Sequence, residues 1–149
     1  QNKDNKYYLK EFLKFSKKIK KVLKKDKYFT LCFHNKNLSI WTNLLNILFL
    51  EGFDLIDISI FNNHGNSFNN NWSKFSPKSD FYITFKNSKK SNQFKKTSNF
   101  NEVIKIKNLA KKNISTKYDS IVSEVIINTF NGIEIIDISD KNIEKLLKQ

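Results

Sequence analysis

The stretch YFTLCFHNKNLSIWTNLLNILFLEGFDLIDISIF, residues 28–61, is the feature that most limits the possible folds. It opens with a short continuous apolar run, Tyr28–Phe33, which is typical of a strand buried on both faces. A helical pattern of apolar residues follows and stops at Gly52, a residue suited to the left-handed position that ends a helix. Residues 54–61 then alternate between apolar and polar, as a half-buried strand does. The stretch therefore predicts a strand, a helix and a second strand.

The residues of the two strands also predict which side chains are buried and which face they share. The single cysteine, Cys32, lies inside the first strand, so we expect a buried thiol and no intramolecular disulfide. In the second strand, the alternation places Ile56, Ile58 and Ile60 on one face. Asp57 should then lie on the other face.

Elements are also predicted on both sides of this stretch. Apolar residues at helical spacing, with lysines on the other side, predict a helix from about Asn5 to Lys25. Residues 81–85 alternate and predict a third strand, after a long Asn-rich loop over 62–79. The first two strands, joined by a crossover helix, should be parallel. The third strand has no helix before it, so we expect it to pair antiparallel with the second.

The predicted sheet is α/β in class and looks incomplete. A first strand that is apolar on both faces needs neighbours on both edges, and the chain offers only one clear side. The pattern is typical of the end of a doubly wound sheet whose beginning is missing. We divide the chain into a sheet portion, 1–88, a linker, 89–99, and a helical C-terminal subdomain, 100–149.

The net charge of +13 is unevenly distributed, and all 27 basic residues are lysine. Residues 1–25 carry a net charge of +8, and residues 87–99 carry +4. Residues 26–86 are neutral, and residues 100–149 carry only +1. Such a patch can attract phosphates. A solvated helix face in a lysine-rich protein produces the same pattern, so both interpretations stay open.

Two stretches resemble the amino-group DNA methyltransferases, which modify exocyclic nitrogens of adenine or cytosine. The stretch from YFTLCFHNK to GFDLIDI is similar to the segment after that family's catalytic strand, where a lysine-rich helix leads to a strand ending in Phe-His-Asn-Lys or similar. The stretch NSFNNNWSKFSPKSDFYITFKN is similar to the family's hairpin, which often reads Ser-Pro-Lys-Gly-Asp. Ser79 replaces the glycine here. The resemblance covers residues 5–88 and implies the C-terminal part of a Rossmann-like class I methyltransferase sheet, with a small helical appendage.

The family's catalytic Asp-Pro-Pro-Tyr motif and its glycine-rich cofactor loop do not occur in this chain. The resemblance therefore implies part of an enzyme that transfers a methyl group from S-adenosylmethionine to an adenine amino group in DNA, with cytosine the less favoured target. A restriction-modification system is the implied setting. We expect no catalytic residue in this chain and no activity by the chain alone. S-adenosylmethionine would be bound mainly outside it, by an upstream region or another polypeptide that carries the missing motifs.

The first candidate site residues are His34 and Asn35, which follow the first strand. Ligands bind outside the carboxyl ends of strands in open α/β sheets. In the fold that the resemblance implies, these two side chains would border the base or cofactor pocket. A structural role is the alternative, in which His34 satisfies a backbone carbonyl and Asn35 or Asn37 caps the following helix.

The second group of candidates lies in the Asn-rich loop. Trp72 could stack on a base, and Lys74 and Lys78 could contact DNA phosphates. Alternatively, Trp72 anchors the loop on the sheet. Two histidines, His34 and His64, and one cysteine are too few to propose a zinc site.

Other classes of function remain as alternatives. A non-enzymatic basic DNA-binding module would use the helices after residue 100, although the +1 charge of that portion argues against it as the main DNA reader. A structural subunit without nucleic acid is the third interpretation. No uncharged apolar stretch is long enough to span a membrane, and no signal peptide is visible, so we expect a cytoplasmic protein with no membrane partner.

Overall fold

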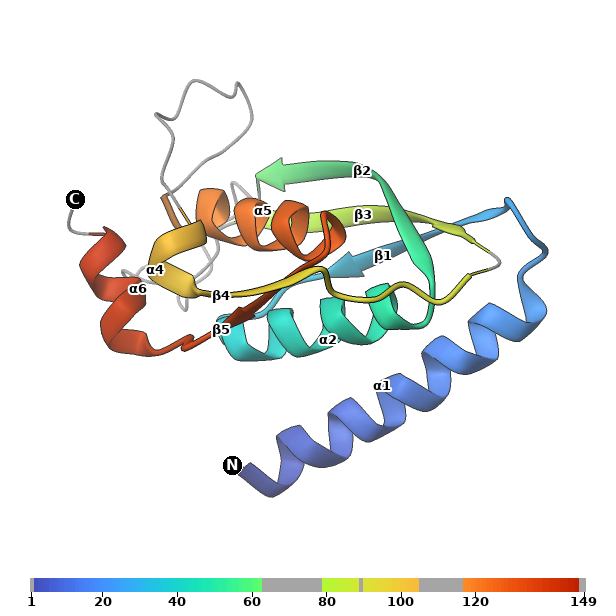
Figure 1. Cartoon of the computed structure of the whole chain (residues 1–149), viewed down its shortest axis with the longest axis horizontal. Helices are drawn as coiled ribbons and strands as arrows, with labels where there is room; N and C mark the ends of the chain where they lie inside the picture. Colours follow the sequence, from blue (N-terminus) through green and yellow to red (C-terminus); the bar gives the residue numbers. More distant parts are fainter. Residues whose placement is uncertain (1, 63–78, 89, 105–116, 148–149) are drawn as a thin grey trace.

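The computed structural model describes residues 2–62, 79–88, 90–104 and 117–147. They form a mixed α/β structure, which confirms the predicted class (Figure 1). The elements, in chain order, are α1 (Asn2–Val22), β1 (Tyr28–Phe33), α2 (Leu38–Leu50), β2 (Phe53–Asn62), β3 (Ser79–Asn87), β4 (Lys96–Asn99), α4 (Phe100–Val103), α5 (Lys117–Phe130), β5 (Ile133–Ile136) and α6 (Asp140–Leu147).

The main sheet has the strand order β1-β3-β2. Strand β3 is antiparallel to both neighbours, and its Tyr82 lies opposite Cys32 of β1 and Ser59 of β2. The predicted antiparallel pairing of β3 with β2 is therefore confirmed. Strands β1 and β2 run in the same direction, as a crossover through α2 predicts, but they are not neighbours because β3 lies between them.

Helices α2 and α5 cover one face of this sheet. Trp41 of α2 packs against Phe81, with ring centroids 5.2 Å apart, and Phe130 of α5 packs against Phe85, also at 5.2 Å. Phe81 and Phe85 lie on the same face of β3 and are fully buried. The hydrophobic core of the described residues therefore lies between this face and the two helices.

The prediction that β1 is buried on both faces is wrong. Its burial alternates: Phe29, Leu31 and Phe33 are half-buried toward the helices, while Tyr28 and Cys32 are exposed. The expected buried thiol is therefore an exposed one. The physical reason is that the described helices α2 and α5 both lie on the same face of the sheet, so alternate residues of β1 stay in contact with solvent.

Strand β2 contains an irregularity that corrects a second expectation. Its register against β3 shifts between Leu55 and Asp57, as in a β-bulge. The extra residue, Ile56, is 51% exposed, whereas Leu55 and Ile58 pack against the core. Ile56 therefore does not share a face with Ile58, because the bulge reverses the alternation at that point.

The outer edge of β1 is unpaired in the part of the chain that the structure describes. Strand β1 pairs with β3 on one side, and no described strand pairs with its other side. Among the described strands, β1 therefore has one neighbour, and that neighbour is β3. An edge of this kind presents a row of backbone N–H and C=O groups that another strand can pair with.

The predicted linker, 89–99, includes strand β4, which pairs in parallel with β5 through residues such as Lys96 and Ile133. One hydrophobic core includes side chains from both flanking portions, for example Leu45 and Ile121. The three-part division of the chain stays a prediction. No helix among the described residues has the length and apolar character needed to cross a membrane.

Local signals in the sequence locate the ends of α2 correctly. The side chain of Asn37 accepts hydrogen bonds from the backbone N–H groups of Ser39 (2.9 Å) and Ile40 (3.4 Å) at the start of the helix. At the other end, Gly52 has a φ of +80°, the left-handed conformation that was predicted for it. Asn37 therefore marks where α2 begins, and Gly52 marks where the chain turns into β2.

Candidate functional site

The candidate site lies at the end of the sheet where β1 and β2 finish and β3 begins (Figure 1). His34 directly follows β1, and Ser79 and Asp80 open β3. Because Phe33 pairs with Phe81, the residues just outside this pair are brought together at the same end of the sheet. The carboxyl end of β1 thus carries polar side chains, as the sequence predicts.

His34 contacts the start of β3 through one ring nitrogen. Its Nδ1 lies 3.1 Å from the backbone oxygen of Ser79 and 3.2 Å from Oδ1 of Asp80. Both neighbours are acceptors, so Nδ1 carries the hydrogen and Nε2 is the basic nitrogen of the neutral ring. The imidazole is 41% exposed, and an approaching ligand can reach it. The contact with a carbonyl is the one expected for a structural role, and the contact with Asp80 orients the ring as well.

Asn35 serves the turn that follows β1. Its side-chain oxygen accepts a hydrogen bond from the backbone N–H of Asn37 at 2.8 Å. Its backbone oxygen accepts one from Nε1 of Trp41 at 2.9 Å. Asn37 rather than Asn35 caps α2. The turn around Asn35 therefore holds His34 in place relative to the core.

A buried carboxylate connects the start of β3 to α5. The hydroxyl of Ser79 donates to Oδ2 of Asp119 at 3.1 Å, and both residues are fully buried. Asp119 lies in the first turn of α5, where a negative charge is stabilised by the helix dipole. Ser79 therefore contacts α5 through its hydroxyl and His34 through its backbone oxygen.

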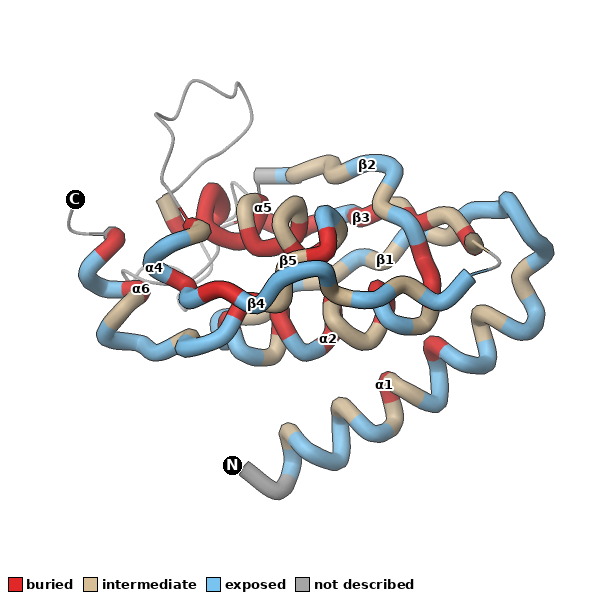
Figure 2. The backbone as a smooth tube through the Cα atoms, in the orientation of Figure 1, coloured by how far each residue is buried: buried red, intermediate tan, exposed pale blue. Residues whose placement is uncertain are grey.

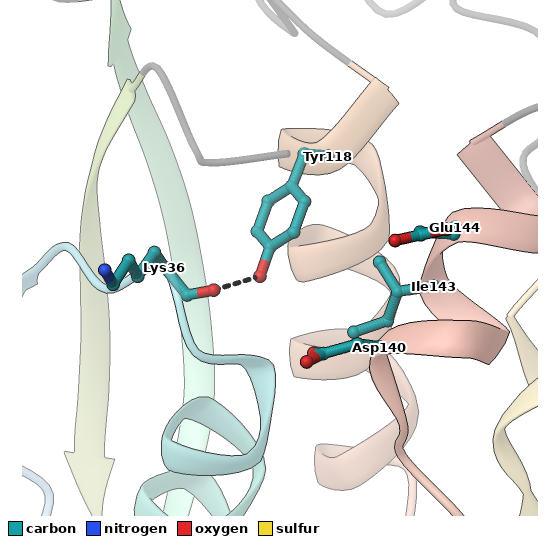
Figure 3. Close-up of a pocket in the computed structure, with 5 residues that line it drawn as sticks. All are labelled: Lys36, Tyr118, Asp140, Ile143 and Glu144. Carbon is teal, nitrogen blue, oxygen red and sulfur yellow. Dashed lines mark hydrogen bonds between the residues drawn. The ribbon is translucent and has the colours of Figure 1, made fainter. Parts of the chain in front are cut away.

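Tyr118 joins α5 to the segment between β1 and α2 (Figure 3). Its hydroxyl donates a hydrogen bond to the backbone oxygen of Lys36 at 2.8 Å. Burial raises the pKa of Tyr118, and the charges of Asp140 and Asp119 raise it further. The phenol therefore remains protonated at neutral pH and acts as a hydrogen-bond donor, not as a base.

A cavity of about 230 Å³ lies beside this tyrosine. Its lining residues are Lys36, Tyr118, Asp140, Ile143 and Glu144. The amino group of Lys36 points away from the phenol, whereas the carbonyl of the same residue faces it (Figure 3). Sites for drug-sized ligands have volumes of about 300–1,000 Å³. The cavity lies below this range, and neither His34 nor Asn35 is among its described lining residues.

The structure does not describe the other site residues that were predicted from the sequence. Trp72, Lys74 and Lys78 lie outside the described residues. Within the described residues, no group of three or more His, Cys, Asp or Glu side chains could hold a metal ion. Of the site residues predicted from sequence, the structure thus describes His34 and Asn35, which are adjacent in the chain and differ in role.

Three residues of this cluster were not predicted from the sequence. Asp80 could have been found only from the pairing of β1 with β3, which makes it the cross-strand neighbour of His34. Tyr118 and Asp119 are distant from His34 in the chain, and no local pattern links them to it. A comparison with models of known protein families, with characterised proteins and with solved structures finds no match.

Proposed function

We propose that this chain is the C-terminal part of an S-adenosylmethionine-dependent DNA amino methyltransferase of a restriction-modification system, acting in the cytoplasm. The methyl acceptor would be an adenine amino group, with cytosine as the less favoured target. The observation that carries the proposal is the arrangement of the sheet: β1 and β2 run parallel and are joined by α2, with β3 antiparallel to both. This arrangement supports the end of a Rossmann-like sheet.

The unpaired edge of β1 supports the second part of the proposal, a partner that carries the chemistry. The strand YFTLCF contains no charged residue and no proline, so it lacks the usual features that prevent an edge from pairing. In the proposed enzyme, this edge pairs with the strand that ends in the Asp-Pro-Pro-Tyr motif. The partner, an upstream region or a separate polypeptide, also holds most of the S-adenosylmethionine.

In this arrangement His34 would lie next to the pocket of the partner. Enzymes that act on a base rotate it out of the duplex and recognise it by hydrogen bonds to its edge. Nε2 of His34 can accept such a bond while Asp80 and the Ser79 carbonyl hold Nδ1. The role of His34 is then to position the base or the catalytic loop. The chain would be inactive without its partner.

The test is reconstitution. The chain is expressed with the polypeptide encoded directly upstream, if that polypeptide contains Asp-Pro-Pro-Tyr and a glycine-rich loop, and transfer of a labelled methyl group to DNA is measured. We expect transfer by the two together and by neither alone. A partner in which the aspartate of the motif is changed to alanine is the matched control. Failure of the two polypeptides to associate, or association without methyl transfer, would count against the proposal.

A DNA-binding module without catalysis is the second candidate. It is favoured by the eight lysines of α1, against two acidic residues in the same helix. DNA binding by the chain alone, together with no methyl transfer in the reconstitution, would favour this candidate. The two functions are therefore separated by the same pair of measurements.

A further inference from the structure

We propose that helix α1 binds the phosphate backbone of a nucleic-acid duplex through a row of four lysines, Lys10, Lys14, Lys17 and Lys21, which we call the α1 lysine row. Their spacing of four, three and four residues places them on one side of the helix. All four side chains are exposed. The choice of DNA as the duplex rests on the proposed function, but the binding itself requires no catalysis.

The opposite side of α1 is attached to the body of the protein, which sets the direction of the lysine row. Phe12 and Ser16 are buried where α1 packs on α2, and Ile19 packs against the same core. Near the end of the helix, the amino group of Lys20 donates to the backbone oxygens of Gly52 and Ser88. Rotation of α1 is thus prevented, and the lysine row faces away from the core.

The positive charge of the lysine row is little neutralised by the rest of the protein. Lys14 forms an ion pair with Glu11 at 2.7 Å. For Lys10, Lys17 and Lys21, no ion pair is found among the described residues. They therefore attract a polyanion whose charges are spaced along a line.

The dimensions of the row match those of a duplex. From Lys10 to Lys21 the helix rises by about 16 Å, at about 1.5 Å per residue. Double-stranded DNA carries about one negative charge per 1.7 Å of axis, so several phosphates lie within reach of the four amino groups. Lysine binds phosphate as a point charge and does not recognise base edges through a bidentate fork. The surface should therefore bind DNA of any sequence.

A lipid surface is the competing partner, because α1 also exposes Tyr7, Phe15 and Val22. A helix that lies in a membrane interface points its apolar face outward. The side of α1 opposite the core carries the lysine row, with Tyr7 beside Lys14, and much of the helix is exposed to water (Figure 2). The orientation of the helix therefore favours a polyanion over a lipid surface.

The experiment compares two variants of the 149-residue chain that lose the same charge. In the first, the four residues of the α1 lysine row are changed to Gln. In the control, Lys90, Lys96, Lys141 and Lys145, which are exposed elsewhere, are changed to Gln. Binding to a labelled DNA duplex is measured by fluorescence anisotropy at several salt concentrations, and circular dichroism checks that both variants are folded.

For the wild-type chain, the logarithm of the binding constant should fall linearly with the logarithm of salt concentration. Each lost phosphate contact reduces the slope by about 0.9, so the first variant should have a slope smaller by about 3 to 4. The control variant should keep the wild-type slope. Changing the four lysines of the row to Arg, which keeps the charge, should also preserve binding.

Two results would overturn the inference. The first is no duplex binding by the wild-type chain, and binding to vesicles with anionic lipids that is lost in Phe15→Ser would then assign α1 to a lipid surface. The second is equal weakening by the two Gln variants, which would assign binding to net charge. Methyl transfer by the reconstituted pair is measured separately. If the inference about α1 is wrong, duplex binding fails the test, whereas if the proposed function is wrong, methyl transfer is absent.

Discussion

Tyr118 of α5 donates a hydrogen bond to the backbone oxygen of Lys36, 2.8 Å away, and so joins the C-terminal portion of the chain to the segment that follows β1. The two residues are separated by 82 positions in the sequence. The tyrosine is only 3% exposed, so its hydroxyl depends on this one carbonyl in place of water. The position of His34, two residues before Lys36, is therefore linked to the packing of α5.

Removing this hydroxyl should destabilise the protein. We expect Tyr118→Phe to lower the free energy of unfolding by about 1 kcal/mol, because a typical intramolecular hydrogen bond contributes about 0.5–1.5 kcal/mol. Urea unfolding measures the change. Tyr7→Phe is the matched control, since Tyr7 is 67% exposed, and it should be neutral. An equal effect of the two substitutions would show that the hydrogen bond contributes nothing to stability.

The same tyrosine predicts a dependence on pH. The pKa of Tyr118 is raised above its ordinary value of 10.0 in the folded protein, mainly by burial. Its contribution to stability is therefore fully present below about pH 10 and is lost as the pH rises further, because the unfolded state releases the proton first. The stability difference between wild type and Tyr118→Phe should shrink above about pH 10. A difference that stays constant or grows would contradict the assignment.

The N-cap of α2 supports a third prediction. Asn37→Ala removes the side-chain oxygen that accepts from Ser39 and Ile40, and it should cost about 1 kcal/mol, within a range of about 0.5–2. Asn43→Ala changes an exposed residue inside the same helix and should alter the stability by less than about 0.5 kcal/mol. Both are measured by urea unfolding. Equal changes would mean that the cap has no special effect.

Two glycines with similar backbone angles allow a matched comparison. Gly52 has a φ of +80° and Gly132 a φ of +88°, so alanine at either position meets the penalty of the left-handed region, about 1–2 kcal/mol. At Gly52 a Cβ would also collide with the backbone oxygen of Lys90. At Gly132 the nearest atoms belong to the side chain of Lys95, 3.3 Å away, which can move. Gly52→Ala should therefore destabilise the protein more than Gly132→Ala in thermal unfolding, and the reverse order would contradict this.

His34 is the residue whose role the proposed function makes testable. In the reconstituted enzyme, His34→Ala should reduce turnover more than it reduces the stability of the chain, because the imidazole is partly exposed and lies at the end of β1. Asp80→Asn should have a smaller effect on turnover, since an amide oxygen can still accept from Nδ1. Steady-state methyl transfer and urea unfolding are measured for both variants. Unchanged turnover in His34→Ala would leave the residue with a structural role only.

Several features could be predicted because they depend on residues close together in the chain. The limits of α2 follow from the cap at Asn37 and the left-handed Gly52, and both are observed. The alternation over residues 81–85 predicts a third strand, and β3 is observed there with Phe81, Ile83 and Phe85 buried. The placement of His34 after a strand was also predicted. In each case, the residues that determine the feature lie within a few positions of one another in the sequence.

Other features could not be predicted because they depend on which segments meet. Cys32 is exposed since both described helices on the sheet cover the face away from it. Ile56 is exposed because the register of β2 against β3 shifts beside it. Asp80 approaches His34 only when β1 pairs with β3. None of these three features can be recognised from the sequence of a single segment.

The sequence by itself determined α1, α2 and the three strands of the main sheet, the parallel direction of β1 and β2, and the concentration of lysine on α1. Periodicity and capping act within a few residues, and a crossover helix sets the relative direction of the strands that it joins. Only the tertiary structure decided that β3 lies between β1 and β2, and therefore which polar side chains meet at the end of the sheet. Strand order is selected by the hydrogen bonds and burial that distant segments share, and these contributions exist only once the segments are in contact.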